Sequence, residues 1–273
     1  MDAPDGVRIF YRDEGEGRPI LLLHGLMAHG GFFERQRSLA GAFRLIAVDL
    51  RGHGESRVGV AAAGVSDLAA DIALLAERLD LRGAIGVGWS LGAAVLWRLL
   101  TGEASDRFAG AVIVDMSPRV LNADAWSLGL TAELCEARSE AIASDFRAFA
   151  TGAGSAIFAQ PLPESMRPLA DWAGGEFARS DPAAIGAIWK SLVEEDSRPA
   201  LPRIAQPTLV VRGAHSQLYG AATAEHLVAA LPDARAVTFP ASGHAPHLEE
   251  PERFNALIHE FAASLPPVLQ PAI

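Results

Sequence analysis

A serine set between two glycines directly after a short apolar run is the feature that most constrains how this chain can fold. The stretch reads Gly88-Trp89-Ser90-Leu91-Gly92, the apolar run before it covers residues 84–87, and residues 93–100 have helical composition. This order predicts a buried strand, a sharp turn that carries Ser90, and a helix whose first amides point back at the serine. So tight a turn places Ser90 near the left-handed backbone region and favours glycine beside it. Because a five-residue match also occurs by chance, the rest of the chain must support it.

Short apolar runs alternate with helical segments along most of the chain. We expect buried strands at residues 20–23, 45–48, 84–87, 111–114, 208–211 and 236–239, an antiparallel strand at 7–11, and helices at 65–79, 91–100, 222–230 and 251–264. Strands that alternate with helices predict an α/β fold with a mostly parallel, doubly wound sheet. With 273 residues, half of them hydrophobic, the chain is long enough for one large unit of this kind.

The interval between Pro118 and Pro207 breaks this rhythm. It has helical patterning and no convincing strand, and residues 151–155 (Thr-Gly-Ala-Gly-Ser) read as a flexible connection. We interpret residues 118–205 as a helical cap over the carboxyl edge of the sheet. The core would then consist of residues 1–117 and 206–273, and an independent second domain is the alternative.

Charge and cysteine content exclude several classes of partner. The net charge is −10, Lys190 is the single lysine among 23 basic residues, and no basic run occurs, which argues against nucleic acid and against an anionic membrane surface. Cys135 is the one cysteine, so an internal disulfide is impossible, and we expect this side chain to be buried. Without a signal peptide or an 18-residue apolar stretch, we expect a soluble cytoplasmic protein, a monomer or a homodimer.

A nucleophilic serine needs a base, and the loop after the last predicted strand supplies one. His244 lies five residues past Phe239 and before the final predicted helix. Loops at the carboxyl ends of parallel strands hold the sites of open α/β sheets, so His244 is the predicted base. We expect His247 to pack or cap nearby, and His53 and His215 are weaker candidates.

The predicted oxyanion site comes from a second loop. His24-Gly25-Leu26-Met27 follows the strand that ends at residue 23, and the glycine allows a sharp turn there. The backbone amides of Leu26 and Leu91 are the predicted donors to a developing oxyanion. We expect His24 to support this loop.

Together these motifs resemble the α/β-hydrolase fold family along nearly the whole chain. The matching stretches, in the order the family has them, are residues 24–25, 49–56, 88–92 and 243–251. The resemblance implies a serine enzyme that needs no metal or organic cofactor, with Ser90 as nucleophile and His244 as base. Relatives that hydrolyse epoxides or haloalkanes carry an aspartate where this chain has Ser90.

The acid of the triad departs from the common family pattern. Most members carry it as Gly-x-x-Asp after the strand matching residues 208–211, but here Ser216 stands in place of the aspartate. Asp115 ends the strand at 111–114, which we expect to lie beside the strand that carries Ser90. A subset of bacterial esterases active on short acyl and acyl-CoA esters pairs Asp-x-x-Pro here with Gly-x-x-Ser later. This chain resembles that subset, so Asp115 is the predicted acid, with Glu225 and Asp233 as reserves.

Aromatic and apolar residues near these loops predict a hydrophobic substrate pocket. The candidates are Trp89, Phe32, Phe33, Met116, Leu121, Trp126 and Trp189. Arg119 is a candidate partner for a substrate carboxylate or phosphate.

The leading functional hypothesis is a serine hydrolase that cleaves a carboxylic ester or thioester of a small-to-medium apolar substrate through an acyl-serine intermediate. A lactonase, a carbon–carbon bond hydrolase of ring-cleavage products and a cofactor-free perhydrolase would use the same triad. From another class, a non-catalytic ligand-binding homologue remains open.

Overall fold

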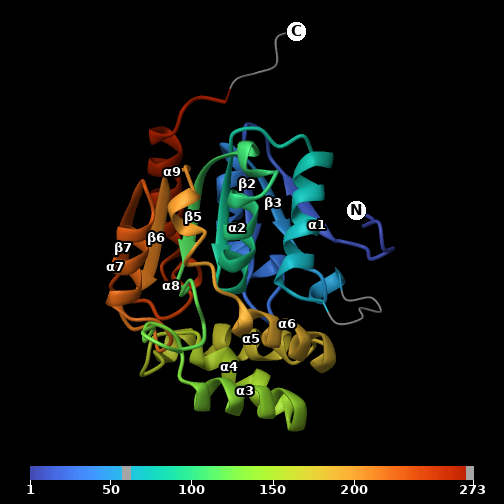
Figure 1. The fold of residues 1–273 in the computed structure, drawn as a ribbon, viewed down its shortest axis with the longest axis vertical. Helices are drawn as coiled ribbons and strands as arrows, with labels where there is room; N and C mark the ends of the chain where they lie inside the picture. The colour runs from blue at the N-terminus through green and yellow to red at the C-terminus, as the bar shows by residue number, and fades with distance from the viewer. Residues whose placement is uncertain (57–62, 269–273) are drawn as a thin grey trace.

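The computed structural model describes residues 1–56 and 63–268 (Figure 1). Its strands are β1 (Tyr11–Glu14), β2 (Arg18–Leu23), β3 (Phe43–Val48), β4 (Ala84–Trp89), β5 (Phe108–Val114), β6 (Thr208–Gly213) and β7 (Ala234–Phe239). These described strands form one sheet in the order β1-β3-β2-β4-β5-β6-β7, with β1 antiparallel to β3 and the other neighbouring pairs parallel. The predicted α/β fold with a mostly parallel sheet is confirmed.

The helices connect the strands and cover the sheet. The α-helices are α1 (Val65–Arg78), α2 (Leu91–Thr101), α3 (Ala132–Ser144), α4 (Phe146–Ala156), α5 (Arg167–Phe177), α6 (Pro182–Glu194), α7 (Ala221–Ala230), α8 (Pro246–Glu249) and α9 (Pro251–Ser264). The 3₁₀ helices are η1 (Gly30–Gly41), which is kinked at Phe33, and the short η2 (Gly54–Ser56), η3 (Ser105–Arg107), η4 (Glu164–Met166) and η5 (Leu201–Arg203). Helices α1 and α2 pack against each other, and α8 and α9 pack against η1.

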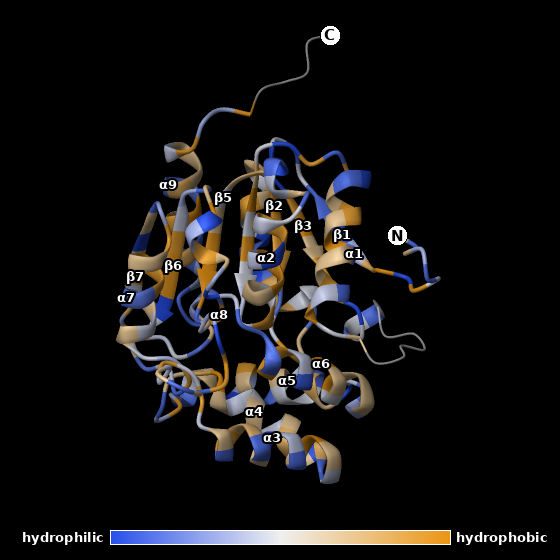
Figure 2. Ribbon diagram, viewed as in Figure 1, coloured by the Kyte–Doolittle hydropathy of each residue, from blue (hydrophilic) through white to orange (hydrophobic). Residues whose placement is uncertain are grey.

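The central strands owe their burial to continuous apolar runs, as expected for parallel strands covered on both faces. Every residue of β4 is buried, and Figure 2 shows the strands as largely hydrophobic while the helices mix hydrophobic and hydrophilic residues. No helix in the described ranges 1–56 and 63–268 is both long and apolar enough to cross a bilayer.

The first strand lies later than its alternating pattern predicts. Instead of residues 7–11, β1 covers Tyr11–Glu14 and pairs with β3. Ile9 is fully buried, which explains the alternation, but its backbone exchanges hydrogen bonds with Met1 rather than with the sheet. The apolar pattern therefore predicts that Ile9 is buried, but it does not predict which segment its backbone bonds to.

Helices α3–α6 lie between β5 and β6 in the chain and sit beyond the end of the sheet to which the parallel strands point (Figure 1). In this described segment, β-structure is limited to isolated bridges such as the one joining Arg119 and Asp196. The division into a core and a cap at residues 118 and 205 stays a prediction. The predicted core also includes residues 57–62 and 269–273, which lie outside the described residues.

The stretch at 151–155 is not a flexible connection. It lies inside α4, where Gly154 meets Gly174 of α5. A Cβ built on Gly154 would lie 2.2 Å from the Gly174 backbone nitrogen, so two glycines allow the helix backbones to touch. The glycines that suggest a loop are instead the residues that permit this helix crossing.

This crossing predicts opposite effects for one substitution at two glycines of α4. Gly154→Ala should destabilise the fold by about 1–3 kcal/mol because its methyl group overlaps backbone atoms that cannot swing aside. Gly152→Ala should stabilise it by roughly 0.5–1 kcal/mol, because nothing lies within 4 Å of a Cβ there and alanine favours a helix. Urea unfolding of both variants measures the difference, and equal effects would contradict the proposed crossing.

Candidate active site

Ser90 occupies a strained turn between β4 and α2. Its φ is +53° and its ψ is −117°, a backbone conformation that residues other than glycine rarely adopt. Glycine is needed on both sides, since a Cβ on Gly88 would lie 2.5 Å from the Gly92 carbonyl oxygen. A Cβ on Gly92 would lie 2.1 Å from the Leu23 oxygen. The strand, the turn and the helix thus form in the order that the motif predicts.

A buried histidine and carboxylate meet next to this turn. His244, in the loop between β7 and α8, places Nδ1 2.6 Å from Asp115 Oδ2. Asp115 follows β5, which lies beside β4 in the sheet, as the strand order predicts. Both side chains are almost completely buried. In this arrangement the carboxylate fixes the orientation of the ring and leaves Nε2 available for proton transfer.

Ser216 takes part in the same contact. Its hydroxyl donates to Asp115 Oδ2 over 2.6 Å and accepts from the amides of Leu218 and Tyr219. At the position where the Gly-x-x-Asp pattern expects an acid, the chain thus carries a hydrogen-bond donor to an acid on the neighbouring strand. Its acceptor bonds anchor the hydroxyl, so Ser216 helps to hold the carboxylate in place.

The loop that carries His244 is tied down on several sides. The Trp89 indole nitrogen donates to the His244 carbonyl over 2.8 Å, and the His244 amide donates to the Ile157 carbonyl over 2.8 Å. The Glu249 carboxylate accepts from the Gly243 amide and from the Ala159 amide, each over 2.7 Å. Burial raises the pKa of Glu249 to about 7. Glu249 therefore joins the His244 loop to the segment that follows α4.

The proposed oxyanion donors lie where the chain leaves two strands. Leu91 is the first residue of α2, so its amide has no partner within the helix. Across the described parts of the chain, neither this amide nor that of Leu26 donates a hydrogen bond to another residue. Met27 follows with φ +66°, and the Ala28 amide closes the turn onto the Gly25 carbonyl. Both amides are thus available to a ligand.

Three further buried histidines support the loops around the site. His24 accepts a hydrogen bond at Nε2 from the Leu50 amide over 2.9 Å, and its ring lies 5.0 Å from that of His53. His247 packs against Trp89, with ring centroids 4.8 Å apart. Burial lowers the pKa of His24 well below its ordinary value, that of His53 to about 4 and that of His247 to about 3. These imidazoles are therefore neutral at neutral pH.

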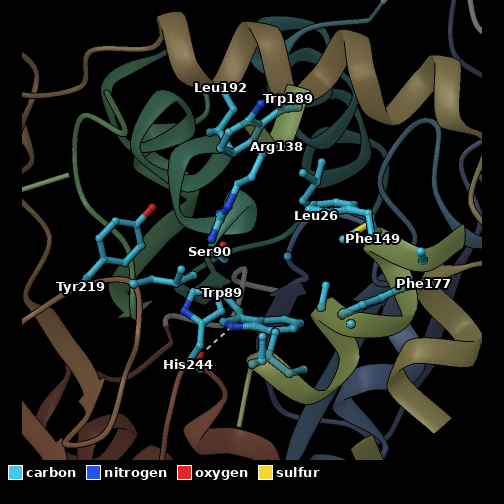
Figure 3. Close-up of a pocket in the computed structure, with 18 residues that line it drawn as sticks. Leu26, Trp89, Ser90, Arg138, Phe149, Phe177, Trp189, Leu192, Tyr219 and His244 are labelled. Atoms are coloured by element: carbon cyan, nitrogen blue, oxygen red, sulfur yellow. Dashed lines mark hydrogen bonds between the residues drawn. The ribbon is translucent and has the colours of Figure 1, made fainter. Parts of the chain in front are cut away.

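Ser90 and His244 open into a cavity of about 370 Å³ (Figure 3). Its lining is Gly25, Leu26, Met27, Trp89, Ser90, Arg138, Ala148, Phe149, Gly152, Ala153, Ala156, Ile157, Phe177, Trp189, Leu192, Leu218, Tyr219 and His244. Of the predicted substrate-binding residues, the structure brings Trp89 and Trp189 to this pocket. The walls are mostly apolar, as expected for a site that holds an apolar ligand.

Three predicted pocket residues lie behind the wall instead. Phe32 stacks on Phe177 with ring centroids 5.2 Å apart, and it is Phe177 that lines the cavity. Phe33 packs against His247, with centroids 5.0 Å apart, and Met116 is buried in the hydrophobic core. Closeness in sequence to the oxyanion loop or to β5 does not determine which side of the wall a side chain occupies.

The other three lie away from the cavity altogether. The Arg119 guanidinium faces the Asp196 carboxylate at 3.9 Å, so its charge already has a partner. Trp126 donates to the Arg119 carbonyl over 2.9 Å and lies under the Arg198 guanidinium. Leu121 lines a separate depression beside α3. These residues stabilise the segment between β5 and α3 and do not contact the site.

Sequence reasoning missed all the residues that α3, α4 and α5 bring to the cavity, among them Arg138, Phe149 and Phe177, and also Tyr219 after β6. The signal for Arg138 is its spacing, because it falls on the same helical face as Cys135, which is buried as expected. In the ranges 1–56 and 63–268, no group of three His, Cys, Asp or Glu side chains could hold a metal ion.

Known proteins match this chain over most of its length. The sequence fits the profile of the alpha/beta hydrolase family over residues 20–257. It is 32% identical over 248 residues to the Pimeloyl-(acyl-carrier protein) methyl ester esterase of Nitrosomonas europaea, a match that covers 88% of this chain and 94% of that protein. An esterase from Exiguobacterium antarcticum superposes with a TM-score of 0.90 at 26% identity, covering 97% of this chain and 98% of that one. A malate-bound thermophilic esterase from Thermogutta terrifontis gives a TM-score of 0.83 at 27% identity, covering 96% and 95%. The chain therefore belongs to the alpha/beta hydrolase family.

Proposed function

We propose that this hydrolase cleaves a carboxylic ester or thioester through an acyl-serine intermediate. The observation that carries the proposal is the 2.6 Å contact between His244 Nδ1 and Asp115 Oδ2 at the edge of the cavity that Ser90 lines. The esterases among its relatives, including one named for a methyl ester, support an ester as substrate.

In this mechanism His244 Nε2 removes the hydroxyl proton of Ser90 while Ser90 Oγ attacks the ester carbonyl carbon. The amides of Leu26 and Leu91 stabilise the oxyanion of the tetrahedral intermediate. When the tetrahedral intermediate collapses, His244 gives its proton to the leaving alcohol or thiol. A water molecule then hydrolyses the acyl-serine by the same route. No hydrogen bond joins Ser90 to His244 among the described contacts, so the two must approach slightly, as is common in unliganded enzymes.

The cavity supports a small substrate, and the net charge of the chain bears on its partners. A cavity of about 370 Å³ with mostly apolar walls suits a short or medium acyl group. The net charge of −10 and the single lysine disfavour nucleic acid and anionic membrane surfaces as partners. We include in the proposal a cytoplasmic location and a monomeric or homodimeric state.

A fluorophosphonate probe and a panel of acyl esters and acyl-CoA thioesters test this function. The wild-type protein should be labelled once and should hydrolyse short acyl esters, because the probe reacts with an activated serine. Ser90→Ala should lose both, whereas Ser144→Ala, which removes an exposed serine of α3, should keep both. A folded wild-type protein that neither reacts with the probe nor hydrolyses any ester would instead support a ligand-binding homologue.

A further inference from the structure

Arg138 stands on the buried face of α3. It follows Cys135 by three residues and precedes Ile142 by four, and both of these are buried. Residues with this spacing share one face of a helix, so the pattern would lead one to expect an apolar residue at position 138. The structure instead places an arginine there, with its side chain in the cavity that Ser90 lines.

The surroundings of this guanidinium are almost entirely apolar. Figure 3 shows the Arg138 side chain running from the top of the cavity toward Ser90, with Trp189 beside it. Both tryptophans of the lining already have hydrogen-bond acceptors, since Trp89 donates to the His244 carbonyl and Trp189 donates to Ser139. Beyond Ser90 and His244, the polar side-chain groups left to face a ligand are therefore those of Arg138 and Tyr219.

Within the described ranges 1–56 and 63–268, Arg138 has no counter-charge. Among the residues that the structure describes, no carboxylate forms an ion pair with it and no acceptor forms a hydrogen bond with it. The buried Arg51, in contrast, contacts the Asp71 carboxylate at 2.6 Å. A guanidinium remains charged in proteins, and a charge shielded from water is costly unless it is paired.

The contact with Trp189 positions this charge without neutralising it. The Arg138 guanidinium carbon lies 5.7 Å from the centroid of the indole ring. Stacking on an aromatic face orients the planar group and leaves its N–H donors free. Because Ser139 separately holds the Trp189 nitrogen at 3.0 Å, the indole does not depend on Arg138 for its position. Arg138 is therefore not needed to hold Trp189 in place.

We propose that Arg138 binds a free carboxylate carried by the substrate, so that the preferred substrates are esters with a second, ionised carboxyl group. This rests on the proposed ester hydrolysis. The two oxygens of a carboxylate match the parallel N–H donors of one guanidinium. The Tyr219 hydroxyl, whose pKa burial raises, stays protonated and supplies a further donor on the same cavity. A phosphate, with its larger charge and additional oxygens, would leave acceptors unpaired against these apolar walls.

Pairs of charged and neutral esters test the proposal. The acyl-side probes are monomethyl esters of straight-chain dicarboxylic acids from succinate to adipate, each compared with the methyl alkanoate of equal length. The alcohol-side probes are ω-acetoxyalkanoates, compared with the matching alkyl acetates. We expect wild-type kcat/KM to be about 10- to 100-fold higher for the charged member of one series, the range that a charge-assisted hydrogen bond supplies.

Arg138→Met keeps a flexible apolar stem and removes the charge. We expect it to abolish the preference for the charged ester by lowering kcat/KM for that ester far more than for the neutral one, mainly through a higher KM. Arg147→Met, which removes an exposed arginine of the adjacent α4, is the matched control and should keep the wild-type preference. Titration of Ser90→Ala with the preferred half-ester, with and without Arg138→Met, measures binding without turnover.

The outcomes separate this inference from the function on which it rests. If wild-type enzyme hydrolyses neutral esters but shows no preference for the charged ones, or if Arg138→Met lowers kcat/KM equally for both, the carboxylate site is wrong and the esterase proposal stands. If the folded enzyme hydrolyses no ester and Ser90→Ala binds no half-ester, both proposals fail.

Discussion

Asp115→Asn is expected to lower kcat by a factor of about 10⁴ while the protein remains folded. The Asp115 carboxylate accepts from His244 Nδ1, which keeps Nε2 free to receive the proton of Ser90. An asparagine amide that donates to Nδ1 would hold the ring in the opposite tautomer, with the proton on Nε2. Steady-state kinetics with the best ester, together with far-ultraviolet circular dichroism, measures both parts of the prediction.

A rescue experiment makes this assignment sharper. Ser216 lies 2.6 Å from the same carboxylate oxygen, on the loop where most relatives carry the acid. Combining Asp115→Asn with Ser216→Asp should therefore recover part of the lost activity, whereas combining it with Ser216→Ala should not. Glu225 and Asp233 make no hydrogen bond or ion pair with His244 in the described structure, since its Nδ1 contact is Asp115. A correctly folded Asp115→Asn variant with nearly wild-type kcat would overturn the role of Asp115.

The buried strands, and the position of β5 beside β4, are the part of this molecule that its sequence predicts best. Buried parallel strands need continuous apolar runs, and strands that follow each other in the chain are usually neighbours in such a sheet, so both the type of sheet and the place of Asp115 beside β4 could be predicted. The alpha/beta hydrolase family and its fold are confirmed. The core of the site follows from the same logic, because residues at the carboxyl ends of neighbouring strands lie close together.

The cavity wall is the part that sequence could not predict. Helical periodicity shows that Cys135, Arg138 and Ile142 share a face, but it does not show that this face borders the cavity. Phe32 and Phe177 illustrate the same limit, since both are buried and stacked but one of them lines the cavity. Which buried side chain forms a wall depends on how separate helices pack, and this is a property of tertiary contacts across long sequence distances.

Acidification below about pH 6.5 is expected to destabilise the fold steeply. The buried imidazoles of His24, His53 and His247 have lowered pKa values, about 4 for His53 and about 3 for His247. An unfolded chain takes up these protons near pH 6.5, while the folded chain stays neutral to lower pH, so each histidine removes up to about 1.4 kcal/mol of stability per pH unit. Urea unfolding at pH 7.5, 6.0 and 5.0 measures the slope.

Glu249 opposes this trend. Its contribution to stability on acidification has the opposite sign because its pKa is raised to about 7. Between about pH 7 and its ordinary value of 4.5 the folded state binds a proton that the unfolded state does not, so acid stabilises the fold through this group. Three histidines outweigh one glutamate, which leaves a net loss on the order of 3 kcal/mol per pH unit near pH 5. His247→Leu should make the decline shallower because it removes an imidazole whose two nitrogens have no hydrogen-bond partner among the described residues. Glu249→Gln should make it steeper. A free energy of unfolding that does not change between pH 7.5 and 5.0 would contradict neutral buried imidazoles. It would mean that these imidazoles are protonated to the same extent in the folded and the unfolded chain.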